Sequence, residues 1–172
     1  MRNVFIVLFL LISVKGSTQT PEENLSKLGI QLPKLPQPIA SYVHVVKTGN
    51  LLFLAGKGPQ KATGEYIKGK LGTDLTSEQG YEASRLVGVL QLAAIKDAIG
   101  DLSKVKRIVK VTGFVNSGSN YYDHSKVING FSDLMIAVFG EKGRHARTSL
   151  GVAALPMNMA VEIEVIVEVE EE

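Results

Sequence analysis

Alternating apolar and charged residues are clearest near the end of the chain. Residues 161–169 read VEIEVIVEV, so valine and isoleucine fall on one side of an extended strand and the glutamates on the other. Two shorter runs rich in β-branched and aromatic residues flank Thr48, Gly49 and Asn50, which is a hairpin signal, and 105–117 is a further run of this kind. The pattern predicts strands in all of these segments.

Apolar residues recur at helical spacing in two other segments. The first begins at Thr76, which forms a capping box with Gln79, and ends at Gly100. The second covers roughly 122–139 and ends at Gly140. The stripes are Ala83, Leu86, Val87, Leu90, Ala93, Ala94 and Ala98 in the first helix, and Val127, Ile128, Phe131, Leu134, Met135 and Val138 in the second.

The order of these elements predicts an α+β domain. We count two helices and about six strands, including a short strand within 57–73 and a strand that begins at Arg147. We expect a mixed β-sheet with both helices packed on one face. The other face carries glutamates and small polar residues and must meet solvent or another subunit. We favour another subunit, because glycine, serine and alanine beside apolar side chains suit close contact.

Residues 1–16 differ from the rest of the chain. Arg2 precedes an apolar run over 4–14, as in a cleaved signal peptide. The run is shorter than the ~20 apolar residues that span a bilayer, so we favour a signal over a membrane anchor or a buried strand. The chain is then exported, periplasmic or secreted, without a stable membrane anchor. Residues 17–38 are rich in proline and are expected to form an extended lead-in to a single domain over 39–172.

Composition excludes several kinds of chemistry. The 172 residues suffice for one domain and include no cysteine, so disulfides, thiolate nucleophiles and cysteine-ligated zinc are excluded. The three histidines do not fall at a zinc-ligand spacing, and we expect no metal site. Loss of Arg2 and Lys15 with the signal reduces the 19 basic residues to 17, which equals the 17 acidic ones. We therefore expect no basic surface for nucleic acid.

The stretch RTSLGVA alternates like a strand but begins with an arginine. Arg147, Ser149 and Gly151 share one face, and the small residues leave room above the guanidinium for a small anion. The alternative is a structural ion pair between Arg147 and Glu162 or Glu164 on a neighbouring strand. The pattern alone leaves both interpretations open.

Three further polar residues are candidates for a site. Glu162 at a cleft or interface could act toward water as a general base or acid, whereas Glu164 fits the solvated face of an amphipathic strand. Tyr42 could cover a pocket or fill the core. Asn129 could donate a hydrogen bond to a ligand or cap a loop.

Two weaker patterns are set aside. The stretch GKGPQ lacks the GxGxxG form and the following helix of a dinucleotide site. His124 and His145 occur beside lysine or arginine, but no serine in a nucleophile-elbow motif accompanies them. We interpret both as surface histidines.

Four stretches together resemble the RidA/YjgF family, also called the L-PSP endoribonuclease family. They are TGNLLFLAGKGP, VKRIVKVTGFVNS, KVINGFSDLMIAVFGEKGRHARTSLGVAALP and VEIEVIVEV, and the likeness runs from Ile39 to Val169, nearest to a longer branch of the family. The resemblance implies a chorismate-mutase-like α+β fold, assembled as a homotrimer with ligand clefts between subunits. It also implies hydrolysis of reactive enamines and imines, such as 2-aminoacrylate, to a 2-oxo acid and ammonia without a cofactor.

By position, the resemblance implies a role for each candidate residue. Arg147 matches the arginine that clamps the substrate carboxylate, and Glu162 matches the glutamate that positions or activates water. Tyr42 and Asn129 match a tyrosine and an asparagine near the cleft. Ser149 stands beside the arginine in the substrate site, where the family often has a cysteine.

Departures from the family pattern bear on the substrate. Gly151 stands where a glutamate is frequent, and AGKGP replaces the familiar SGQIP. The alternative to a deaminase is therefore a non-catalytic trimeric module of the same fold that binds a small carboxylate. A ribonuclease, which the older family name suggests, is disfavoured by the balanced charge and by the absence of a basic aromatic surface.

Overall fold

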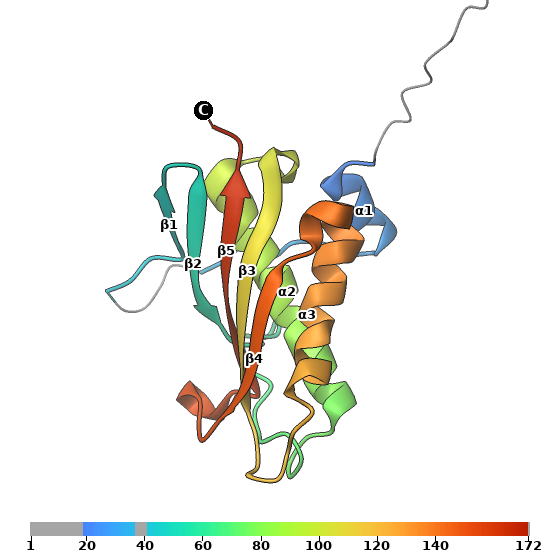
Figure 1. Ribbon diagram of the computed structural model, residues 1–172, viewed down its shortest axis with the longest axis vertical. Helices are drawn as coiled ribbons and strands as arrows, with labels where there is room; N and C mark the ends of the chain where they lie inside the picture. The colour runs from blue at the N-terminus through green and yellow to red at the C-terminus, as the bar shows by residue number, and fades with distance from the viewer. Residues whose placement is uncertain (1–18, 37–40, 172) are drawn as a thin grey trace, which may run out of the picture.

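Five strands form one mixed β-sheet in the computed structural model, which describes residues 19–36 and 41–171 (Figure 1). The strand order is β1-β2-β5-β3-β4; β3 and β4 run parallel, and the other neighbouring pairs are antiparallel. The last strand of the chain, β5, therefore lies at the centre of the sheet. The strands are β1 (Val45–Thr48), β2 (Leu51–Lys57), β3 (Val105–Asn116), β4 (Ala146–Val152) and β5 (Val161–Val169).

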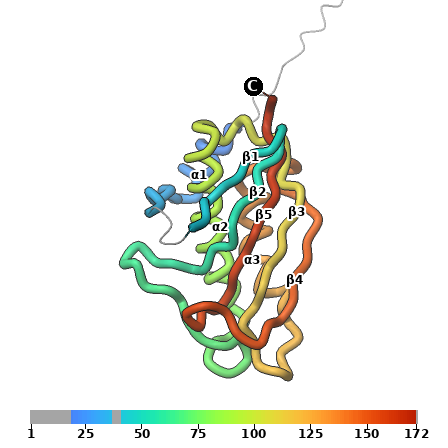
Figure 2. Tube along the Cα trace, turned by 90° about the vertical axis from the view of Figure 1, so that its left-hand side faces the viewer, coloured from blue at the N-terminus to red at the C-terminus, as the bar shows by residue number. Residues whose placement is uncertain are grey.

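The helices cover one face of this sheet, as Figure 2 shows from the side. They are α1 (Pro21–Lys27), α2 (Ser77–Ile99) and α3 (His124–Phe139). The two predicted helices are confirmed as α2 and α3, and α2 begins with the predicted capping box between Thr76 and Gln79. The predicted α+β class, with the helices on one face of a mixed sheet, is confirmed. The short strand expected within 57–73 is wrong, because that segment makes isolated bridges such as Lys68 with Met159.

Glycines set the distances between the layers. Gly130 of α3 lies against α2, and a side chain there would collide with the main-chain carbonyl oxygen of Tyr81. Gly113 of β3 leaves a space that the side chain of Ile128 fills. α3 therefore lies close above β3 and its neighbour β4, where Arg147 is found.

The alternation predicted for 161–169 is confirmed in β5. Its valine and isoleucine side chains at every second position are buried under the helices. Glu162 and Glu164 extend from the opposite face, which the described helices leave uncovered. The apolar half of the pattern thus forms the core, and the polar half forms the free face of the sheet.

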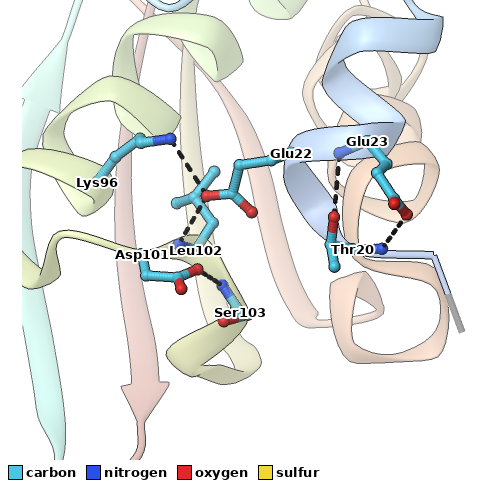
Figure 3. A network of polar contacts seen from close by, with 7 residues as sticks. All are labelled: Thr20, Glu22, Glu23, Lys96, Asp101, Leu102 and Ser103. Carbon is cyan, nitrogen blue, oxygen red and sulfur yellow. Dashed lines mark hydrogen bonds and ion pairs between the residues drawn. The ribbon is translucent and has the colours of Figure 1, made fainter.

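The prediction of an extended lead-in over 17–38 is wrong, because α1 lies within it. Thr20 caps this helix: its Oγ1 accepts from the Glu23 N–H at 3.2 Å, and the Glu23 carboxylate accepts from the Thr20 N–H at 3.0 Å (Figure 3). The prolines suggested an irregular segment, but Pro21 occupies the first turn of the helix, where a missing N–H costs nothing. The Thr-Pro-Glu-Glu sequence was the signal for this helix.

Polar contacts dock α1 onto the domain. The Oε1 of Glu22 accepts from Lys96 Nζ at 3.2 Å and from the Leu102 N–H at 3.0 Å (Figure 3). The side-chain amide of Asn24 donates to the Val138 carbonyl oxygen at 2.9 Å, and Leu25 is buried in the core. Residues before the predicted domain start at 39 are therefore part of the same folded unit.

The predicted signal peptide, residues 1–16, lies outside the described residues. Within the described part of the chain, no helix combines the length and apolar character needed to cross a membrane.

Candidate ligand site around Arg147

Arg147 faces the helices from the edge strand β4. In the parallel register, Arg147, Ser149 and Gly151 pair with Val111, Gly113 and Val115, whose side of β3 is covered by α3. The prediction that these three residues of β4 share one face is confirmed. The guanidinium therefore lies between the edge of the sheet and α3.

Neutral acceptors hold the guanidinium in place. Nη1 of Arg147 donates to Oδ1 of Asn129 at 2.9 Å and to Oγ of Ser132 at 3.0 Å, both on α3. Nη2 has a longer contact of 3.5 Å with the Ser125 carbonyl oxygen. None of the carboxylates in residues 19–36 and 41–171 forms an ion pair with Arg147. Its positive charge is thus oriented by Asn129 and Ser132 and is not neutralised by a carboxylate of these described ranges.

A histidine completes the hydrogen bonds behind Arg147. Nδ1 of His145 lies 2.7 Å from the Gly143 carbonyl oxygen, which can only accept, so neutral His145 carries its proton on Nδ1. Its Nε2 then accepts from the Ser132 hydroxyl at 3.0 Å. Burial lowers the pKa of His145 and the nearby charge of Arg147 lowers it further, while the bond to Gly143 acts in the opposite direction.

The interpretation of His145 as a surface histidine is therefore wrong. Its side chain is half-buried, and its ring meets the ring of Phe131 edge-on, with centroids 6.3 Å apart. The sequence did contain a signal, since His145 precedes Arg147 by two residues and so shares its side in an extended segment. Ser132 lies on α3, so the alternation of residues along β4 could not predict its contact with His145.

Ser149 lies beside Arg147 on the same face of β4. Its Oγ is shielded from solvent and has no hydrogen-bond partner among the residues that the structure describes. Farther along the strand, a side chain at Gly151 would collide with Nε2 of His124, which is bonded at 3.1 Å to Oγ of Ser117. His124 is therefore also a bonded, half-buried residue, contrary to the interpretation as a surface histidine.

Glu162 is on the other face of the sheet. It pairs with Phe114 of β3, and Glu164 pairs with Thr112, so both carboxylates leave the sheet on the face away from α3. The alternative of an ion pair between Arg147 and either glutamate is wrong for a single chain, because β3 separates β4 from β5 and the side chains point to opposite faces.

The environment of Glu162 alters its acidity. Burial raises the pKa of this carboxyl, and the neighbouring charge of Glu164 raises it further. Gly56 of β2 lets the carboxylate lie close to the strand, because a side chain there would collide with Oε1 of Glu162. A half-buried carboxyl of raised pKa is a candidate for general acid–base catalysis.

The free face of the sheet also carries a shallow hollow. Its volume is about 300 Å³, and its lining includes Val43, Val46, Phe53 and Glu164. Tyr42 is 54% exposed and directly precedes Val43, which lines this hollow, so the interpretation that Tyr42 fills the core is wrong. Of the predicted site residues, Arg147 and Asn129 are thus in contact within one chain, and Ser149 lies beside Arg147. Glu162 and Tyr42 are not part of this group.

No group of three or more histidine, aspartate or glutamate side chains in the described residues could hold a metal ion.

Comparisons with known proteins agree on one family. The chain matches the family model described as "YjgF/chorismate_mutase-like, putative endoribonuclease" over residues 22–169. It is 43% identical over 146 residues to Protein TCP17 of Trypanosoma cruzi, with 84% of this chain and 91% of the relative covered. It is 32% identical over 142 residues to the 2-iminobutanoate/2-iminopropanoate deaminase of Dermatophagoides farinae, with 82% and 95% covered. The crystal structure of Atu1372 from Agrobacterium tumefaciens, a protein of unknown function, superposes with a TM-score of 0.81 at 40% identity, with 88% and 94% covered.

Proposed function

The chain belongs to the RidA/YjgF family, and we propose that it hydrolyses reactive enamines and imines of small carboxylates to 2-oxo acids and ammonia. A relative that is 32% identical carries the name of a deaminase of this kind. The family also includes proteins with endoribonuclease-like names, so the choice of reaction depends on the chemistry of the site.

The proposal rests on one observation, the way in which the guanidinium of Arg147 is bonded. Its guanidinium is held by Asn129 and Ser132, and no carboxylate among the described residues pairs with it. A half-buried arginine without a carboxylate partner in the described part of the chain suits an anionic ligand, and its planar fork suits a carboxylate. The substrate is anchored here by its carboxylate, which fixes the plane of the neighbouring imine.

Glu162 supplies the proton transfer. The carboxylate accepts a proton from water as the water oxygen adds to the imine carbon, and the proton is returned to the nitrogen. The hydroxyl proton of the resulting carbinolamine then passes to the nitrogen, and the C–N bond breaks as the C=O bond of the 2-oxo acid forms, so that ammonia is released. An enamine substrate first takes a proton on carbon to become the imine.

Arg147 and Glu162 can serve one substrate only if two copies of the chain contribute. They leave opposite faces of the sheet in one chain, so a site that uses both requires Arg147 of one subunit and Glu162 of another. The uncovered face, with the hollow beside Phe53 and Glu164, provides the contact surface for a homotrimer with clefts between subunits. Tyr42 is exposed and precedes Val43 of this hollow, which supports a role for Tyr42 at the border of the cleft.

A carboxylate-binding module without catalysis is the second candidate. It is favoured by the fact that the residues holding Arg147 all lie in one chain, so binding does not depend on Glu162. It would have been favoured further by an ion pair between Arg147 and Glu162, which the structure does not contain. Export of the chain by a signal at 1–16 stays a prediction in either case.

Ammonia release by the purified chain tests the proposal. The substrate is 2-aminoacrylate formed in situ by a dehydratase, and Arg147→Ala is measured in parallel. Acceleration over the uncatalysed rate that is lost in the variant supports the deaminase. No acceleration by a folded chain, together with binding of pyruvate that depends on Arg147, would replace the deaminase with the binding module.

A further inference from the structure

The hydrogen bonds behind Arg147 point to a role for His145, given the function proposed above. We propose that neutral His145 positions Arg147 through Ser132, so that the affinity of the site for a carboxylate falls in acid. His145 does not contact the ligand in this arrangement. It acts as a positioning residue, and its protonation regulates the site.

The donors and acceptors of this chain of bonds have one consistent assignment. The Gly143 carbonyl oxygen accepts from Nδ1 of His145, so Nε2 is the acceptor for the Ser132 hydroxyl proton. The oxygen of Ser132 is thereby left free to accept from Nη1 of Arg147 at 3.0 Å. The position of one proton on His145 thus sets the orientation of the hydroxyl that holds Arg147.

The surroundings of the imidazole are rigid. Gly143 packs against α3 so closely that a side chain there would collide with the Met135 carbonyl oxygen, which fixes the acceptor for Nδ1. The Phe131 ring lies edge-on to His145 at an interplanar angle of 77°. The ring therefore keeps its place, and a change in protonation is passed to Ser132.

Protonation of His145 reverses the role of Nε2. As a donor, Nε2 no longer accepts from the Ser132 hydroxyl, and an imidazolium then lies beside the guanidinium of Arg147. Burial and Arg147 hold the pKa of His145 below its ordinary value of 6.5. The neutral form therefore prevails at neutral pH. As the pH falls below 6.5 through the lowered pKa, the bond from the Ser132 hydroxyl to Nε2 is lost and a second positive charge appears beside Arg147, which disturbs its position.

Nearby charges do not compensate a protonated His145. Glu141 is paired with Arg144 at 3.0 Å, and Asp133 of α3 accepts from the Tyr81 hydroxyl at 3.0 Å. Lys142 donates to the Val105 carbonyl oxygen at 3.1 Å. Lys126 of α3 is paired with Asp123 at 2.8 Å. The charged side chains on α3 and in residues 141–147 are thus Lys126, Asp133, Glu141, Lys142, Arg144 and Arg147, and of these Arg147 bears on the pKa of His145.

Calorimetric titration with pyruvate from about pH 5 to about pH 8 tests the proposal. All variants carry Glu162→Gln, so that Glu162 does not titrate in the same range. With His145 present, we expect the affinity to fall about tenfold in acid, as for the loss of one hydrogen bond to a charged group. His145→Gln offers an oxygen to the Ser132 hydroxyl without titrating, and we expect it to keep its affinity in acid.

Ser132→Ala provides a second test should His145→Gln fail to fold. We expect a lower affinity at every pH and no further loss in acid, with folding checked by circular dichroism at each pH. An equal acid loss in His145→Gln or in Ser132→Ala overturns the proposal. An affinity that rises in acid also overturns it, since the imidazolium would then contact the carboxylate directly.

Arg147→Ala separates this proposal from the proposed function. Unchanged pyruvate affinity in that variant removes the anchor on which the proposed function depends. Binding that requires Arg147 but does not change between pH 5 and pH 8 leaves the anchor in place and overturns only the role of His145.

Discussion

Arg147 and Glu162 lie on opposite faces of the same β-sheet. Arg147 is in register with Val111 and Glu162 with Phe114, and these two residues of β3 are an odd number of positions apart. Side chains alternate along a strand, so the two charged groups leave the sheet in opposite directions. Within one chain they cannot meet at a small ligand.

Replacing Arg147 by lysine tests the fork of the guanidinium. Lysine keeps the charge but cannot donate to Asn129 and Ser132 while binding a carboxylate through two parallel bonds. We expect kcat/KM for 2-aminoacrylate to fall about tenfold or more, as for loss of a charge-assisted hydrogen bond. Arg144→Lys is the matched control, because Arg144 is exposed and paired with Glu141. Equal rates for Arg147→Lys and the unchanged chain would contradict the clamp.

Replacing Glu162 by glutamine tests the proton transfer. We expect kcat to fall by about 10²–10⁴, the usual contribution of a general acid–base group. Burial and Glu164 raise the pKa of Glu162 above its ordinary 4.5, so activity in the unchanged chain should rise as the pH rises through that raised pKa. Rate profiles against pH for Glu162→Gln and for the control Glu164→Gln provide the measurement.

The same titration affects folding. Because the pKa of Glu162 is raised in the folded state, protonated Glu162 stabilises the fold below the ordinary pKa, and this stability is lost as the pH rises through the raised value. The melting temperature of the unchanged chain should therefore drop relative to that of Glu162→Gln over this range. A constant difference between the two would show that the carboxyl is not perturbed.

A charge on the free face of the sheet tests the assembly. Phe53 is 42% exposed on that face, and we expect Phe53→Lys to convert a trimer into monomers. Turnover should fall at least as far as in Glu162→Gln, because each cleft loses its second subunit. Leu28→Lys is the control, since Leu28 is 41% exposed but lies at the end of α1 on the helical side. Light scattering after size exclusion gives the mass, and a Phe53→Lys trimer with full activity would contradict the shared site.

Gly130→Ala tests the contact between α2 and α3. The added methyl group would collide with the Tyr81 carbonyl oxygen, and main chain can move only if the helices separate. We expect the free energy of unfolding to fall by about 1–3 kcal/mol, as for overpacking of a core. Ala137→Ser on the exposed side of α3 should change it by less than about 0.5 kcal/mol. Urea titrations of the two variants give the comparison.

Much of the fold could be predicted because local pattern and burial agree. The alternation in 161–169 predicts a strand and the capping box at Thr76 predicts the start of a helix, and both elements are found. The helix α1 was not predicted, because the prolines in 17–38 are typical of an extended segment. Pro21, however, is at a position that a helix accepts. Tertiary contacts from Glu22 and Asn24, more than propensity, fix so short a helix.

The candidate site could be predicted only in part. The face shared by Arg147 and Ser149 follows from strand alternation, but the partners of Arg147 depend on how α3 lies over β4. The position of Glu162 relative to Arg147 could not be predicted, because it depends on the order of the strands. Alternation within β4 and within β5 cannot show that β3 lies between them. His145 was misjudged since a histidine next to arginine in a sequence gives no sign of what its ring will bond.

The central position of β5 has a consequence for how the chain reaches its folded state. β2 and β3 have no contact in the sheet except through β5, which is formed by the final stretch of the sequence. The hairpin of β1 and β2 and the parallel pair of β3 and β4 therefore remain two separate pieces until residues 161–169 are available to join them. A nascent chain therefore cannot complete this sheet before residues 161–169 have been synthesised, and until then β2 and β3 have no common neighbour to pair with.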